Sequence, residues 1–213
     1  MAMTKRQLQS GTNFLSINPD ALDYLARTRH AEVVCYLDYD GVLQSDRVYR
    51  HPKGGIYVGQ TDSMASSLFE HVGELVRALE PYPDIRIVLS TDWVRKLSYT
   101  RAKSYLPDAL SVRVIGATYH SFAHGRDSAL KFVHNESSRA TQILADVQRR
   151  KPKFWFAIDD DTVDWPKHLA KNLVECEGST GLGSPKALEA LGRILDNIRE
   201  SRRVRVDVPS FRR

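Results

Sequence analysis

Two carboxylates two residues apart, Asp38 and Asp40, are the residues whose type and spacing most directly suggest chemistry. They follow an apolar run at residues 33–37, which is too short for an ordinary helix, and they precede Gly41. This pattern predicts a buried strand that ends in a turn. Because side chains alternate along a strand, both carboxylates would point to one side at its carboxyl end, where open α/β sheets bind ligands. The two charges repel, so we expect a hard divalent cation such as Mg²⁺ between them.

A second acidic cluster follows another apolar run. Residues 154–158 predict a buried strand, and this strand ends in Asp159, Asp160 and Asp161. Clustered carboxylates raise one another's pKa unless a cation offsets their charge. A solvated loop is the alternative interpretation, but the position at the end of a predicted strand favours a site.

Hydroxyl groups stand at the end of a further predicted strand, residues 85–89. Ser90 and Thr91 follow it and precede a helix predicted over residues 93–105. A hydroxyl beside a helix N-terminus offers a phosphate oxygen both a donor and the positive end of the helix dipole. The alternative is structural, because Ser and Thr are also common N-cap residues.

Helices and strands alternate along the rest of the chain. Apolar periodicity and breaker residues predict helices near residues 19–28, 63–80, 127–135, 137–150 and 185–199, strands at 111–115 and 173–174, and a glycine-rich surface loop at 178–183. This alternation predicts an α/β fold, a doubly wound domain with a mainly parallel sheet. We assign residues 1–18 to a loose arm, 19–200 to a single domain and 201–213 to a basic C-terminal tail.

The composition indicates one well-filled core and an anionic partner. The chain has 213 residues, of which 42% are hydrophobic, a formal net charge of +5 and a pI near 9.2. The charge favours a nucleotide or a nucleic acid without choosing between them. Cys35 and Cys176 make no disulfide framework, and no segment resembles a signal sequence or approaches the ~20 apolar residues of a membrane span. We therefore expect a cytoplasmic protein that does not enter the membrane.

The sequence Asp-x-Asp-Gly-Val-Leu that begins at Asp38 resembles the first motif of the haloacid dehalogenase-like (HAD) superfamily in its phosphatase form. The resemblance implies that Asp38 is a nucleophile that forms an aspartyl-phosphate and that Asp40 is the general acid and base. The second acidic cluster is similar to the fourth HAD motif, with Asp160 as a metal ligand supported by Asp159. Mg²⁺ is then the expected cofactor, with these four aspartates as its candidate ligands.

The second and third HAD motifs are a Ser or Thr at a strand end and a Lys or Arg near a helix start. Ser90 matches the former by position, with Thr91 beside it as a candidate substrate-binding residue. Arg139 matches the latter, and an arginine fork suits a phosphate. Lys131 is the alternative for this third motif.

Two further features carry the resemblance. Residues 89–93, Leu-Ser-Thr-Asp-Trp, resemble the corresponding run in a HAD branch found in Swiss-army-knife RNA-repair proteins. Residues 44–60 match in position the β-hairpin flap of HAD proteins, with Arg50 and Lys53 as candidate substrate-binding residues, although a solvated hairpin is the plain alternative.

The resemblance implies a strand order with Asp38 on the central strand. The intervals between motifs leave no room for a large cap domain, so we expect an open site that suits a large substrate.

Two classes of function fit the sequence. The first is a Mg²⁺-dependent phosphohydrolase that acts on a phosphorylated nucleic-acid end, another large phosphorylated substrate or a small metabolite. The second is a catalytically idle HAD-like module that binds nucleic acid or protein through its basic surface. The clustered acids favour the first, because a binding module has no need of carboxylates that repel phosphate. The sequence leaves the oligomeric state open.

Overall fold

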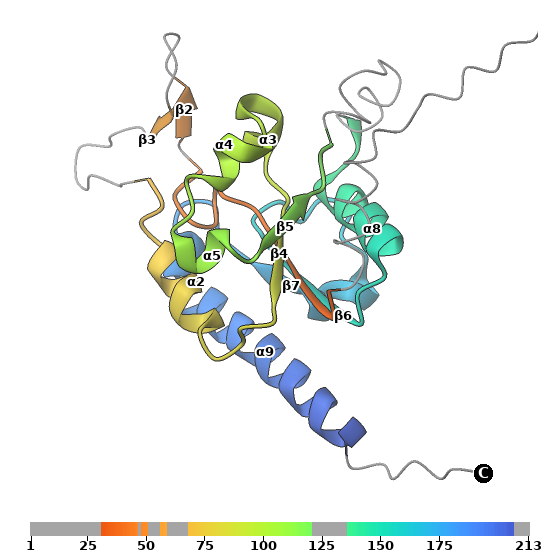
Figure 1. Cartoon of the computed structure of the whole chain (residues 1–213). Coiled ribbons are helices and arrows are strands. Elements are labelled where there is room, and N and C mark those ends of the chain that lie inside the picture. Colours follow the sequence, from red (N-terminus) through yellow and green to blue (C-terminus); the bar gives the residue numbers. More distant parts are fainter. Residues whose placement is uncertain (1–30, 47, 51–55, 59–67, 121–135, 207–213) are drawn as a thin grey trace, which may run out of the picture.

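A five-stranded parallel sheet forms the centre of the computed structural model, which describes residues 31–46, 48–50, 56–58, 68–120 and 136–206 (Figure 1). Its order is β5-β4-β1-β6-β7, so β1 is central. The strands are β1 (Val33–Leu37), β4 (Arg86–Leu89), β5 (Val114–Ala117), β6 (Phe154–Asp159) and β7 (Leu173–Glu175). This doubly wound α/β architecture and its strand order confirm the predicted fold class.

Helices cover both faces of the sheet. They are α2 (Val72–Leu79), α3 (Asp92–Leu97), α4 (Tyr99–Lys103), α5 (Asp108–Ser111), α8 (Arg139–Arg150) and α9 (Pro185–Val206), with 3₁₀ turns at Lys167–Asn172 and Gly181–Gly183. Figure 1 shows α2 and α9 on one side of the sheet and α8 on the other. A two-stranded antiparallel hairpin, β2 (Val48–Arg50) with β3 (Ile56–Val58), follows the first motif as predicted.

The alternation of side chains along β1 divides the core in two. Cys35 and Leu37 pack in the larger core with α2 and α9, whereas Val34 and Tyr36 pack in the smaller core with Ile143 of α8. All five residues of β1 are buried, as expected for a parallel strand covered on both faces. The central strand is therefore fixed from two sides, and its carboxyl end is a rigid support.

Several predicted boundaries are corrected by the structure. The helix expected over 93–105 is two helices, because Ser98 has φ 104° and its side chain caps α4 by accepting from the Arg101 N–H. The strand expected at 111–115 begins later, at Val114, because the chain first makes the short helix α5.

The last helix extends past the predicted end at residue 199, through Val206. The guanidinium of Arg202, which the sequence assigned to a tail, pairs with Asp84 and lies 3.6 Å from Glu32. The helix expected over 63–80 is described as α2, from Val72 to Leu79. The arm at 1–18 and the helices expected at 19–28 and 127–135 lie outside the described residues.

No large cap domain is present in the described parts of the chain. None of the helices described there is both long and apolar enough to cross a membrane. The cytoplasmic location stays a prediction.

Candidate active site

Three adjacent strands of the sheet deliver polar residues to the same edge. Leu37 pairs with Leu89 on one side and with Ile158 on the other. The residues that follow these three positions, Asp38, Ser90 and Asp159, therefore lie side by side at the carboxyl end of the sheet. This is the edge where open α/β sheets bind ligands.

Asp38, Asp159 and Asp160 form a compact group of acids. One carboxylate oxygen from each lies within 4.8 Å of the others. Asp159 is fully buried, and its Oδ2 has no hydrogen-bond partner among the described residues. A buried carboxylate oxygen that accepts no hydrogen bond, next to two further carboxylates, is a fitting environment for a hard cation such as Mg²⁺, which takes oxygen ligands. Asp40, also expected as a ligand, is not in this group.

Arg139, the first residue of α8, faces two of these acids. Its Nη2 lies 3.4 Å from Asp38 Oδ2, and its Nε lies 3.6 Å from Asp159 Oδ2. Burial alone would lower the pKa of Arg139, but the charges of Asp38 and Asp159 outweigh burial and raise it above its usual value. The guanidinium is therefore charged and is positioned to meet both a carboxylate and a phosphoryl group. The alternative third-motif residue, Lys131, lies outside the described residues.

Asp38 is held firmly in this setting. Its Oδ1 accepts a hydrogen bond from the Tyr39 N–H at 2.7 Å. Burial raises the pKa of Asp38 to about 6, while Arg139 and the Tyr39 N–H act in the opposite direction. Burial and the charge of Asp38 also raise the pKa of Asp159 well above its usual value. A cation next to these groups would favour their ionised forms.

The carboxylate of Asp40 is held by two donors from the other side. Trp93 Nε1 lies 3.0 Å from each of its oxygens, and Gln44 Nε2 donates to Oδ1 at 2.8 Å. Gln44 is itself fixed, because its Oε1 accepts from the Phe69 N–H at 3.0 Å. Burial raises the pKa of Asp40, and the hydrogen bonds from Gln44 and Trp93 act against that rise. Asp40 is thus oriented beside Asp38 by two neutral donors.

The two hydroxyl residues after β4 have different surroundings. Ser90 is fully buried, and its Oγ has no hydrogen-bond partner among the described residues. Thr91 is the N-cap of α3, where its side chain accepts from the Trp93 N–H at 3.4 Å. The cap accounts for Thr91 structurally, whereas Ser90 keeps a hydroxyl available at the edge of the sheet.

The comparisons with known proteins agree with this geometry. The model of the HAD domain in Swiss Army Knife RNA repair proteins matches residues 34–187, most of the chain. The chain belongs to this family. The match spans all the motif residues described above, and the protein is a HAD-like phosphatase.

Matches to solved structures are more distant. A protein from Vibrio cholerae described as a 3-deoxy-D-manno-octulosonate 8-phosphate phosphatase is 16% identical, with 84% of this chain and 90% of that chain covered and a TM-score of 0.39. A protein from Pseudomonas syringae described as a YrbI family phosphatase is 16% identical, with 88% and 99% covered and a TM-score of 0.32. No curated protein matches the chain.

The glycine-rich segment predicted as a surface loop is one only in part, because Ser179, Thr180 and Gly183 are exposed whereas its middle is packed against the first motif. Gly181 and Leu182 are buried, and the Leu182 N–H donates to the Val42 carbonyl at 2.9 Å. The Asp46 N–H donates to the Gly178 carbonyl at 2.8 Å. A Cβ at Gly178 would lie only 2.7 Å from Asp46 Oδ2 and 3.1 Å from Asp160 Oδ2. The segment therefore closes one side of the acidic group.

The flap residues expected to bind substrate are not placed. Arg50 ends strand β2 of the hairpin, and its side chain is not among those described. Lys53 lies outside the described residues. Their roles stay predictions.

Proposed function

We propose that the chain is a Mg²⁺-dependent phosphohydrolase that forms an aspartyl-phosphate on Asp38. The observation that carries the proposal is the position of this carboxylate. It lies at the carboxyl end of the central strand, with the Arg139 guanidinium on one side and two further acids within reach of a single cation. This arrangement offers a nucleophile, positive charge for a phosphoryl group and a cation site in one place.

Asp38 and Asp40 divide the chemistry between them in this proposal. A carboxylate oxygen of Asp38 forms a bond to phosphorus while the bond from phosphorus to the leaving oxygen breaks, and that oxygen takes a proton from Asp40. Asp40 then accepts a proton from a water molecule, whose oxygen displaces Asp38 from phosphorus and releases inorganic phosphate. The Ser90 hydroxyl donates to a phosphoryl oxygen, and Arg139 offsets the negative charge.

The acids Asp38, Asp159 and Asp160 are the residues that would hold the cation. When bound, Mg²⁺ supplies positive charge that screens the phosphoryl oxygens from the carboxylates. Binding is supported by the buried Asp159 Oδ2, which accepts no hydrogen bond from the residues that the structure describes, and by the distances within the group of three. Asp40, whose oxygens are engaged by Trp93 and Gln44, keeps the acid and base role.

As substrate we propose a phosphorylated end of a nucleic acid, RNA in particular. Three observations support it: the RNA-repair proteins in which this family of domains occurs, the net charge of +5, and the absence of a large cap from the described residues. A chain end can reach a site that is open at the edge of the sheet, and basic residues favour the phosphate backbone.

The test is hydrolysis of p-nitrophenyl phosphate with and without Mg²⁺, by wild type and by Asp38→Asn. We expect activity in wild type only with Mg²⁺ and none in the variant, because an amide is a poor nucleophile and a poor ligand. Circular dichroism confirms that the variant is folded. Undiminished turnover in folded Asp38→Asn would overturn the mechanism. If the enzyme hydrolyses small phosphate esters but no phosphorylated oligonucleotide end, the proposed nucleic-acid substrate is overturned.

A further inference from the structure

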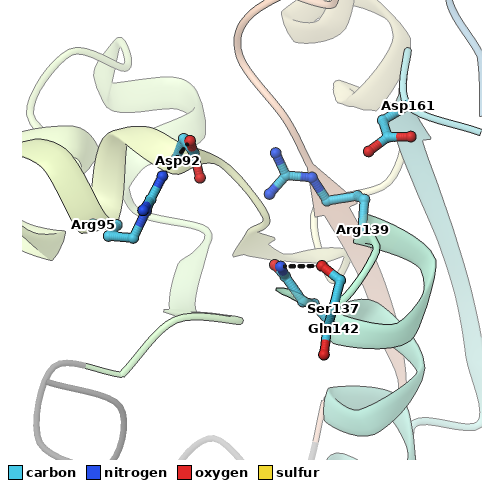
Figure 2. A pocket seen from close by; sticks show the side chains of 6 residues that line it. All are labelled: Asp92, Arg95, Ser137, Arg139, Gln142 and Asp161. Atoms are coloured by element: carbon cyan, nitrogen blue, oxygen red, sulfur yellow. Dashed lines mark hydrogen bonds and ion pairs between the residues drawn. The ribbon is translucent and has the colours of Figure 1, made fainter. Parts of the chain in front are cut away.

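A polar pocket opens beside the reaction centre, between the start of α3 and the start of α8 (Figure 2). Its volume is about 230 Å³. Six side chains line it: Asp92, Arg95, Ser137, Arg139, Gln142 and Asp161. In Figure 2 the Arg139 guanidinium points into the space between Asp92 and Asp161.

Arg139 links this pocket to the proposed nucleophile. Its guanidinium lines the pocket and also places Nη2 3.4 Å from Asp38 Oδ2. A group bound in the pocket would therefore contact the same guanidinium that contacts Asp38, the carboxylate proposed to attack phosphorus. A leaving group seated in the pocket would thus lie beside the guanidinium that also faces the proposed nucleophile.

The lining is polar throughout, with no aromatic or aliphatic side chain among the six residues. A nucleobase would find no ring on which to stack. Two carboxylates balance the two guanidinium groups, and Arg95 Nη2 already pairs with Asp92 Oδ2 at 2.8 Å. A second phosphate would therefore meet little net positive charge. Hydroxyl groups, in contrast, can donate to carboxylates and accept from guanidinium groups.

The pocket is also held in shape by its own hydrogen bonds. Gln142 Nε2 donates to the Ser137 carbonyl at 3.0 Å, and Asp161 Oδ1 accepts from the Val163 N–H at 3.0 Å. Its volume is below the roughly 300–1,000 Å³ typical of sites that take a whole drug-sized ligand. It has room for one sugar and not for an entire nucleotide.

We propose that this pocket binds the sugar that carries the scissile phosphate and that it makes the enzyme prefer esters of polyhydroxylated alcohols. The inference rests on the proposed phosphohydrolase function and adds the substrate class to it. Asp161 and Gln142 are the residues whose polar groups recognise the sugar hydroxyls.

Two small esters isolate the contribution of the pocket. Ribose 5-phosphate and n-butyl phosphate both release a primary alcohol, so the chemical step is alike and only the hydroxyl groups differ. We expect wild type with Mg²⁺ to show a kcat/KM at least about tenfold higher for ribose 5-phosphate, the size of about one hydrogen bond to a charged group. Hydrolysis of p-nitrophenyl phosphate measures the phosphatase activity of each preparation independently of the sugar hydroxyls.

The variants Gln142→Ala and Asp161→Asn should lower that preference. The asparagine keeps an oxygen that can accept from the Val163 N–H, so the local turn is retained. Gln148→Ala, on the same helix, and Asp164→Asn, on the same loop, are matched controls, because both residues are exposed and neither lines the pocket. We expect the controls to keep the wild-type ratio of kcat/KM values and the pocket variants to lower it about fivefold to tenfold.

The outcomes separate this inference from the function on which it rests. Equal kcat/KM for the two alkyl esters, or equal ratios in pocket and control variants, would overturn the sugar pocket while hydrolysis of p-nitrophenyl phosphate upholds the phosphatase. If wild type hydrolyses none of the three esters, both proposals are overturned. Circular dichroism of every variant excludes unfolding as the cause.

Discussion

Replacing Trp93 by Phe keeps an aromatic ring but removes the indole N–H that donates to Asp40, the proposed general acid and base. The Trp93 indole is buried and packed edge-on against three rings, with centroid distances of 5.5 Å to Tyr39, 5.5 Å to Phe69 and 5.0 Å to Tyr105. Its Nε1 lies 3.0 Å from both oxygens of Asp40. The packing fixes the indole, and the indole fixes the carboxylate.

The expected loss of activity in Trp93→Phe follows from the strength of this hydrogen bond. A bond to a charged acceptor contributes about 1.5–3 kcal/mol, which corresponds to roughly 10- to 150-fold. Gln44 still donates to Asp40 in the variant, so we expect a loss near the lower end, about tenfold. The loss must stay below that of Asp40→Asn, since general acid and base catalysis is worth ~10²- to 10⁴-fold in total.

The assay compares kcat/KM for n-butyl phosphate and p-nitrophenyl phosphate, because this constant reports the first phosphoryl transfer. Butoxide needs a proton as it leaves, whereas p-nitrophenolate does not. Trp93→Phe should therefore lower kcat/KM for the butyl ester about tenfold and for the aryl ester much less.

Tyr105→Leu is the control for packing, because it removes a ring that contacts Trp93 and leaves Nε1 in place. It should lower the melting temperature without changing the ratio of the two kcat/KM values. If Trp93→Phe lowers kcat/KM for both esters equally, the indole acts through packing alone and the reasoning is refuted.

Three further predictions concern the cation and the substrate. Asp160→Ala should raise the Mg²⁺ concentration at half-maximal activity, whereas Asp40→Asn should lower the rate ~10²- to 10⁴-fold without that shift, as titrations with Mg²⁺ will show. Burial raises the pKa of Asp38 from 3.8 to about 6. Without the cation, the ionisation of this group therefore lowers the free energy of unfolding of the protein as pH rises through that range. Mg²⁺ should accordingly raise the melting temperature more at pH 8 than at pH 5, and an equal rise at both would contradict the proposed ligands. Reversing Arg50 and Lys53 to Glu should weaken activity on an oligonucleotide end far more than on p-nitrophenyl phosphate; equal losses would mean that the flap does not recognise a polymer.

The strands were predictable because their signals are local. The apolar runs at β1, β4 and β6 each end in polar residues, and this places their carboxyl ends together once the strands are parallel. The helix break at Ser98 depends on one residue with φ 104°, which sequence periodicity does not report. The extension of α9 brings Arg202 into contact with Asp84, 118 residues away in the chain, and a local pattern does not report such a contact.

The same distinction applies to the site. Asp38, Asp159 and Asp160 stand out in the sequence, since acids after an apolar run are unusual. Trp93 and Gln44 were missed, because an aromatic residue in a helix and a glutamine in a loop ordinarily indicate packing and solvent exposure. A signal for Trp93 was present: it lies two residues after Thr91, in the first turn of α3.

The charge of the site explains why its activity and its stability should depend on the same cation. Arg139 is the basic residue that the described structure places against Asp38 and Asp159, and one positive charge cannot offset two buried carboxylates and the neighbouring Asp160. A Cβ at Gly41 would collide with Asp160 Oδ2, so a larger residue there would push this carboxylate out of place. The fold thus holds the acids together against their repulsion, at a cost that a bound cation removes. In the proposed mechanism that cation is what allows ionised acids and a phosphoryl group to share this edge of the sheet.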